Sequence, residues 1–194
     1  MGVDDSNKVD LGGDSMSEKE QLYDLLNELA IDLKPFIKAV LDAAPYSFWT
    51  IPASSTGKYH PELSRGEGGL VRHTLAAVYM AKELFRAYDT TKAEEDTVIA
   101  ALMIHDIGKA MAEPHDIVGA TKLRYIAKDF DCPMAYAVIA GVRWHMGCWS
   151  TGSTHCAEAE RGQKAFPHGF SKVEQIVHIA DYVVSRKRFI LEAA

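Results

Sequence analysis

The sequence predicts a single all-α domain of about six or seven helices with two long irregular loops. Apolar residues recur at intervals of three and four in several segments, which is the spacing of one buried helix face. No segment of useful length alternates apolar and polar residues, and no internal repeat is found. At 194 residues and 47% hydrophobic content, the chain can bury one sizeable core without a second domain.

The start of the chain is expected to stay outside this domain. Residues 1–16 are rich in Gly and Asp and have no apolar period, so we expect a flexible tail before a domain at 17–194. Ser17 and Glu20 have capping-box spacing, and leucines follow at helical intervals. Pro35 then suits the first turn of a second helix.

The rest of the chain alternates long loops with helical patterns. Residues 45–69 contain too many Pro, Gly and Ser for a regular element, and a loop of this length is usually functional or disordered. Four helices are expected at roughly 70–88, 93–106, 116–129 and 134–146. A second irregular stretch at 147–170 precedes a final helix, which starts at Ser171 with Glu174 completing a capping box.

Composition limits the kind of partner. A net charge of −6 disfavours binding to an extended nucleic-acid duplex but allows a local basic pocket for a few phosphates. The three cysteines form no close pair, which indicates a reducing compartment. No run approaches about 18 apolar residues, and the N-terminus lacks a secretory signal pattern. We therefore expect a cytoplasmic protein with no membrane partner and a small phosphorylated substrate.

Ionisable side chains fall on the apolar faces of the predicted helices. His73 lies three residues after Leu70 and four before Ala77, and His105 and Asp106 end a helix with almost no polar face. The same reasoning places two further residues inward, His145 and Asp181. Each could be a separate hydrogen-bonded core residue. A metal centre would satisfy all five at once, because an unpaired buried carboxylate is costly.

Two residues near the dyad add to this pattern. Gly108 lets the chain leave the helix tightly, which places Lys109 close to whatever the metals bind. His115 precedes the helix that begins "DIVGA" and is a sixth candidate ligand.

In this order the motifs resemble the HD-domain metal-dependent phosphohydrolase superfamily, in its HDIG form. The resemblance rests on His73, "HDIGK" at 105–109, "HDIVGA" from His115, "RWHMG" around His145 and "HIADY" around Asp181. It implies an HD-type helical bundle in which His73, His105, Asp106 and Asp181 are metal ligands. Subgroups of this superfamily that bind two metals have two additional histidine ligands between the dyad and the last Asp. His115 and His145 occupy the corresponding places in this sequence.

The resemblance also implies an activity. It implies hydrolysis of a phosphate ester or anhydride of a nucleotide-type substrate by metal-activated water. We expect Asp106 and Lys109 to be the catalytic residues, Lys109 because it directly follows the dyad and can meet negative charge on the substrate. The donor set suits one or two divalent ions of Fe, Mn, Co, Ni or Zn. Residues expected to bind substrate phosphate or sugar are Lys58, His60, Arg72 and Arg143. Two alternatives stay open: a non-catalytic metal-containing nucleotide-sensing or interaction module of the same fold, and a metal-dependent oxygenase.

Overall fold

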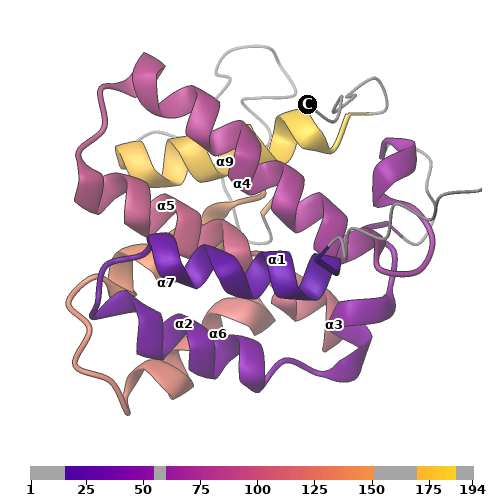
Figure 1. The fold of residues 1–194 in the computed structure, drawn as a ribbon, viewed down its shortest axis with the longest axis horizontal. Helices are drawn as coiled ribbons and strands as arrows, with labels where there is room; N and C mark the ends of the chain where they lie inside the picture. Colours follow the sequence, from indigo (N-terminus) through magenta and orange to yellow (C-terminus); the bar gives the residue numbers. More distant parts are fainter. Residues whose placement is uncertain (1–15, 55–59, 151–169, 187–194) are drawn as a thin grey trace, which may run out of the picture.

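Every regular element in the described chain is a helix. The computed structural model describes residues 16–54, 60–150 and 170–186. Its α-helices, shown in Figure 1, are α1 Glu18–Asp24, α2 Leu33–Asp42, α3 Tyr46–Thr50, α4 Gly69–Tyr88, α5 Lys92–Ile104, α6 His115–Ala127, α7 Ala135–Trp144 and α9 Lys172–Val184. Short 3-10 helices lie at Leu25–Glu28, Glu62–Ser64, Ile107–Ala110 and Gly147–Trp149. The all-α prediction is confirmed.

Several helices begin where the sequence provides a cap. The hydroxyls of Ser17, Thr91 and Ser171 each accept the backbone N–H three residues later, and the glutamate there accepts the cap N–H in return. α4 begins differently, after Gly68, which has a positive φ of 71°. A Cβ on Gly69 would overlap the carbonyl of Ser64. The loop before α4 can therefore lie directly against the first turn of this helix.

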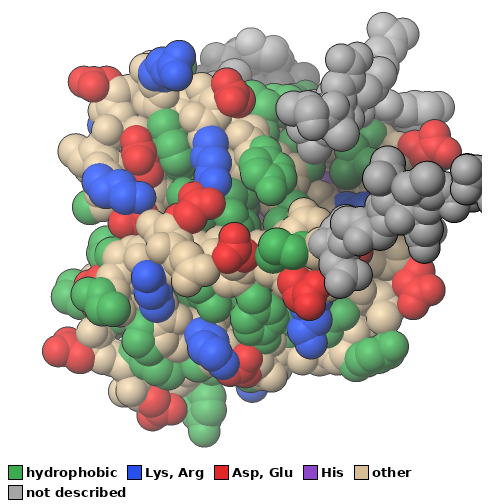
Figure 2. All heavy atoms as spheres, in the orientation of Figure 1, with side chains coloured by type: hydrophobic (Ala, Val, Ile, Leu, Met, Phe, Trp, Pro, Cys, Tyr) green, Lys and Arg blue, Asp and Glu red, His purple; other side chains and the backbone are tan. Residues whose placement is uncertain are grey.

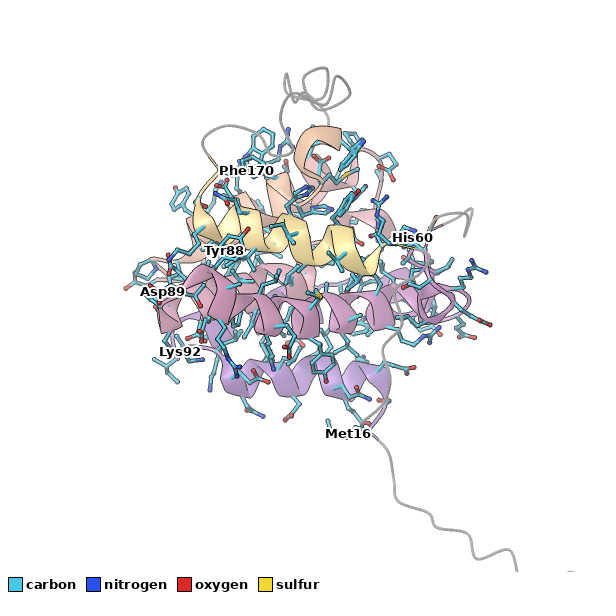
Figure 3. All side chains as sticks on the ribbon, turned by 90° about the horizontal axis from the view of Figure 1, so that it is seen from above. Met16, His60, Tyr88, Asp89, Lys92 and Phe170 are labelled. Carbon is cyan, nitrogen blue, oxygen red and sulfur yellow. The ribbon has the colours of Figure 1, made fainter. Side chains whose placement is uncertain are left out.

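α4 and α9 run in opposite directions, cross at an angle and pack against each other (Figure 1). At one end His73 contacts Asp181, and at the other Lys172 Nζ donates to the backbone carbonyl of Asp89 at 2.9 Å. Figure 3 shows His60 beside one end of α9 and Phe170 at the other. α5 packs against both helices and is buried continuously from Asp96 to Ile104. These three helices bring their inward polar residues to one end of the core.

α6 and α7 complete that end of the molecule. They pack against each other where Gly119 approaches Val142, and α7 also packs on α5 and α9. Gly141 allows the close approach to α5, because a Cβ there would lie 3.0 Å from the Cβ of Ala101. α1 covers α4, and α2 covers α5 and α6.

Some predictions of detail were wrong, and others lie outside the described residues. α3 lies within 45–69, which was expected to hold no regular element, because a five-residue helix is too short to show an apolar period. The predicted tail, except Met16, and most of the predicted loop at 147–170 lie outside the described residues. Among the described helices, none has the length and apolar character needed to cross a membrane.

Candidate metal centre

The His-Asp dyad lies at the buried C-terminal end of α5. His105 and Asp106 follow Ile104 directly, and their exposed fractions are 0% and 1%. The chain then turns at once into the 3-10 helix Ile107–Ala110. A Cβ on Gly108 would overlap the carbonyl oxygen of His115. Only glycine therefore lets the dyad approach the start of α6 this closely.

One group of donors surrounds Oδ2 of Asp106. The Nε2 atoms of His73 and His105 lie 3.6 and 3.4 Å from this oxygen and 3.4 Å from each other. Oδ1 of Asp181 lies 3.0 Å from Nε2 of His73 and 3.7 Å from Nε2 of His105. α4, the end of α5 and α9 thus contribute to one cluster of four side chains, which we call the first donor group.

A second group surrounds the other oxygen of the same carboxylate. Oδ1 of Asp106 lies 3.5 Å from Nε2 of His115 and 3.4 Å from Nε2 of His145. These two Nε2 atoms are 3.2 Å apart. Asp106, His115 and His145 form the second donor group, and Asp106 belongs to both groups.

Hydrogen bonds on the far side of three imidazoles fix which nitrogen faces the cluster. Nδ1 of His105 lies 2.7 Å from the carbonyl of Leu102, and Nδ1 of His145 lies 2.7 Å from the carbonyl of Val142. A carbonyl can only accept, so the neutral ring carries its hydrogen on Nδ1. Nδ1 of His115 likewise faces the carboxylate of Glu113 at 3.1 Å. Each neutral ring therefore keeps its Nε2 lone pair for a cation.

The charges of the cluster also favour a cation. Burial opposes ionisation of Asp106, but Lys109 and His105 hold the pKa of this carboxyl well below its usual range. For Asp181, burial is likewise outweighed by His105 and His73, and its pKa is well below the usual range. Burial acts to lower the pKa of His105, but Asp106 and Asp181 raise it to about 10. Two ionised carboxylates thus hold positive charge in the core, and a metal cation would take the place of a proton there.

The residues present fit a divalent transition-metal ion. Oδ1 of Asp106 is buried and has no hydrogen-bond partner among the described residues, which is unfavourable for a charged oxygen unless a cation binds it. Imidazole nitrogens with carboxylate oxygens suit Fe, Mn, Co, Ni or Zn. The side chains that could hold ions are those of the two donor groups: His73, His105, Asp106 and Asp181 in the first, and Asp106, His115 and His145 in the second.

A cavity of about 420 Å³ opens onto this cluster. Its floor includes His115, His145 and Asp181. One wall is aromatic, because the rings of Trp149 and Tyr182 stack with centroids 5.6 Å apart and an interplanar angle of 10°. The cavity therefore has polar side chains at its floor and aromatic rings on one wall. This composition is common in sites that bind small molecules.

Two of the residues expected to act on substrate line this cavity. Lys109 Nζ lies 2.6 Å from Oδ2 of Asp106 and 3.2 Å from the carbonyl of Ala53. The ring of His60 lies against that of His73, with centroids 5.6 Å apart. Burial is the main cause that lowers the pKa of His60 to about 4, so this ring is neutral at pH 7. Lys58 lies outside the described residues.

Arg72 is placed differently from the expectation. Its guanidinium donates to the backbone carbonyls of Leu63, Arg65 and Glu67 at 2.7 to 2.9 Å. It also lies 3.3 Å from the carboxylate of Glu18. Arg72 therefore ties the loop that precedes α4 to the helix, and we do not include it among the proposed substrate contacts.

Arg143 is also held by protein groups. Its Nη1 lies 2.6 Å from Oδ2 of Asp116, a fully buried carboxylate, and contacts the hydroxyl of Ser150. The guanidinium also lies over the ring of Trp144. We therefore omit Arg143 from the proposed substrate contacts as well.

Sequence reasoning missed part of the cavity wall. Tyr182 and Arg186 line the cavity, and the guanidinium of Arg186 lies 3.8 Å from the centroid of the Tyr182 ring. The position of Tyr182 directly after Asp181 is the signal that could have indicated it. His178, three residues before Asp181, donates from Nδ1 to the carbonyl of His145 at 2.7 Å. This hydrogen bond supports the turn that follows α7.

The chain belongs to the HD-domain family. The family model for the HD domain matches residues 70–185, which is more than half of the chain. The match begins three residues before His73 and ends four residues after Asp181, so it covers both donor groups. No curated protein and no solved structure matches the chain. HD domains are generally metal-dependent phosphohydrolases, so the family supports the same chemistry as the donor set.

Proposed function

We propose that this protein is a phosphohydrolase that uses one or two divalent transition-metal ions to cleave a phosphate ester or anhydride of a nucleotide-type substrate. The observation that carries the proposal is the position of Asp106 between two donor groups, with each of its oxygens facing a pair of imidazoles. Ions bound to such donors lower the pKa of a water molecule and stabilise charge on phosphoryl oxygens.

The chain's own residues supply the remaining functions. Lys109 carries its positive charge next to Asp106, in a position to pair with an anionic substrate oxygen at the cavity floor. His60 presents a neutral imidazole to the same cavity. This ring can donate a hydrogen bond to a phosphate oxygen or accept one from a sugar hydroxyl. Lys58 is also proposed to contact a substrate phosphate, and this proposal is based on the sequence alone.

The aromatic wall favours a nucleotide over a simple phosphate ester. Trp149 is 54% exposed although it stacks on Tyr182, so it can offer a ring face to a planar base. The cavity volume is within the range of small-molecule sites. On the face drawn in Figure 2, basic and acidic side chains are interspersed. The described part of that face therefore offers no continuous basic surface for an extended duplex. The cytoplasmic location expected from the sequence stays a prediction.

The proposal is tested by product release from a panel of nucleoside mono-, di- and triphosphates and dinucleotides. Metal-free protein would be supplied in turn with Mn, Co, Ni, Fe, Zn and Mg, and the Asp106→Ala variant would be the control. We expect phosphate or nucleotide release that depends on the added metal and is lost in the variant. Tight binding of metal and nucleotide without turnover under any condition would instead support the nucleotide-sensing module.

A further inference from the structure

Three buried or nearly buried side chains connect the ends of α6 and α7 to the turn that follows α7. Asp116, the second residue of α6, has an exposed fraction of 0%, and its Oδ2 accepts from Arg143 Nη1 at 2.6 Å. The hydroxyl of Ser150 donates to the same oxygen and accepts from Arg143. We call Asp116, Arg143 and Ser150 the α6–α7 clamp.

The clamp lies next to the second donor group. Asp116 directly follows His115, and Arg143 comes two residues before His145. A pair of charges joined across these two helices therefore also fixes how far apart the two histidines lie. Their Nε2 atoms are 3.2 Å apart.

The two donor groups differ in part in how the backbone supports them. His105 and the shared Asp106 come at the end of α5. The other two ligands of the first group, His73 and Asp181, lie within α4 and α9, where hydrogen bonds on both sides hold the backbone. His115 is the first residue of α6, and His145 is the residue after the last of α7. Helix ends lack part of the intrahelical bonding and fray more readily, so these two ligand positions need support from side chains.

Packing between α6 and α7 supplies only part of this support. Gly119 approaches Val142 about one helical turn from each histidine, which sets the distance between the helices there. The clamp adds a direct link between the first turn of α6 and the last turn of α7, through side chains one and two residues from the histidines.

We infer that Asp116, Arg143 and Ser150 are positioning residues that hold His115 and His145 together and so determine whether the second donor group binds an ion. This inference rests on the metal centre of the proposed function. It adds that occupancy of the second group can be changed separately from occupancy of the first, by residues that touch neither metal nor substrate.

The experiment is a titration of metal-free full-length chain with Mn²⁺, which measures the number of bound ions and the affinity of each, with the melting temperature recorded alongside. In Asp116→Asn and Ser150→Ala we expect the affinity for the second ion to fall by about 10-fold or more, as for other changes behind metal ligands. The first ion should bind as in the parent. Ser150→Thr keeps the hydroxyl and should restore the second ion.

Asp96→Asn is the matched control, because Asp96 is also nearly buried, with an exposed fraction of 3%, and pairs with Lys92 at 2.7 Å away from the cluster. It should lower stability and still bind two ions. Parent-like second-ion affinity in Ser150→Ala and Asp116→Asn would overturn the inference. Equal loss of both ions in these variants, or the same loss in the control, would also overturn it. Ser150→Ala alone decides the matter if Asp116→Asn does not fold.

A parent chain that binds a single Mn²⁺ and still hydrolyses nucleotides would overturn the clamp's role and leave the phosphohydrolase standing. A parent chain that binds two ions in the clamp-dependent way, but hydrolyses none of the panel, would overturn the activity and leave the clamp standing.

Discussion

The ammonium group of Lys109 lies 2.6 Å from Oδ2 of Asp106, the carboxylate common to both donor groups. Burial acts to lower the pKa of Lys109, but Asp106 and Asp181 raise it, so the side chain is charged at neutral pH. A fixed positive charge beside the site of hydrolysis can stabilise an anionic substrate as its charge develops.

Lys109→Ala is therefore expected to lower kcat/KM by about 10-fold or more, or at least about 1.4 kcal/mol of transition-state stabilisation. Metal content should be retained, because the donor atoms are unchanged. The control is Lys82→Ala on α4, whose ammonium pairs with Glu28 away from the cavity. Steady-state kinetics and elemental analysis check both points, and parent-like kinetics in Lys109→Ala would remove this residue from the site.

His60→Ala should weaken kcat/KM by about 10-fold, with a smaller effect than Lys109→Ala, because a neutral hydrogen bond is weaker than one to a charged donor. The pKa of His60 is lowered to about 4, mainly by burial, and a bound cation would lower it further. The loss should therefore be the same at every pH between about 6 and 8. A pH profile that differs between variant and parent across this range would show that His60 transfers a proton.

His115→Ala and His145→Ala should each retain one tightly bound ion and lose most turnover, because each removes a donor from the second group only. Asp106→Ala should lose both ions, since Asp106 belongs to both groups. Elemental analysis after gel filtration measures the ratio of ions to chain. Full occupancy in Asp106→Ala would contradict the assignment, and parent-like binding and turnover in both histidine variants would show a mononuclear centre.

Arg72→Ala should lower the free energy of unfolding by about 1–3 kcal/mol, because the loop before α4 loses several charge-assisted hydrogen bonds in a half-exposed setting. Urea unfolding measures this change. Arg86→Ala, on an exposed position of the same helix, is the control and should be nearly neutral. Unchanged stability with a large loss of kcat/KM would return Arg72 to the substrate contacts expected from the sequence.

The fold and the inward placement of the polar residues could be predicted because they depend on local patterns. Helical spacing put His73, His105 and Asp106 on apolar faces, and all three are fully or almost fully buried. Capping boxes gave the starts of α1 and α9. The role of these side chains as metal ligands stays a proposal, supported by their convergence.

The partners of the basic residues could not be predicted, because they depend on contacts distant in sequence or on the backbone. Arg143 pairs with Asp116, 27 residues earlier, and no local pattern signals that pair. Arg72 bonds to backbone carbonyls, which every residue carries. Both were expected to bind substrate because they lie near ligand positions in sequence. Proximity along the chain does not show where a long, flexible side chain ends.

Anomalous X-ray diffraction from crystals of the protein loaded with Mn²⁺ or Co²⁺ would locate the bound ions directly. We expect two anomalous peaks, one in each donor group, with an oxygen of Asp106 within about 2.0–2.2 Å of each ion. The first ion should also contact His73, His105 and Asp181, and the second His115 and His145. Peaks only at other positions, or none in a crystal that contains the metal, would show that the two donor groups do not form the metal centre.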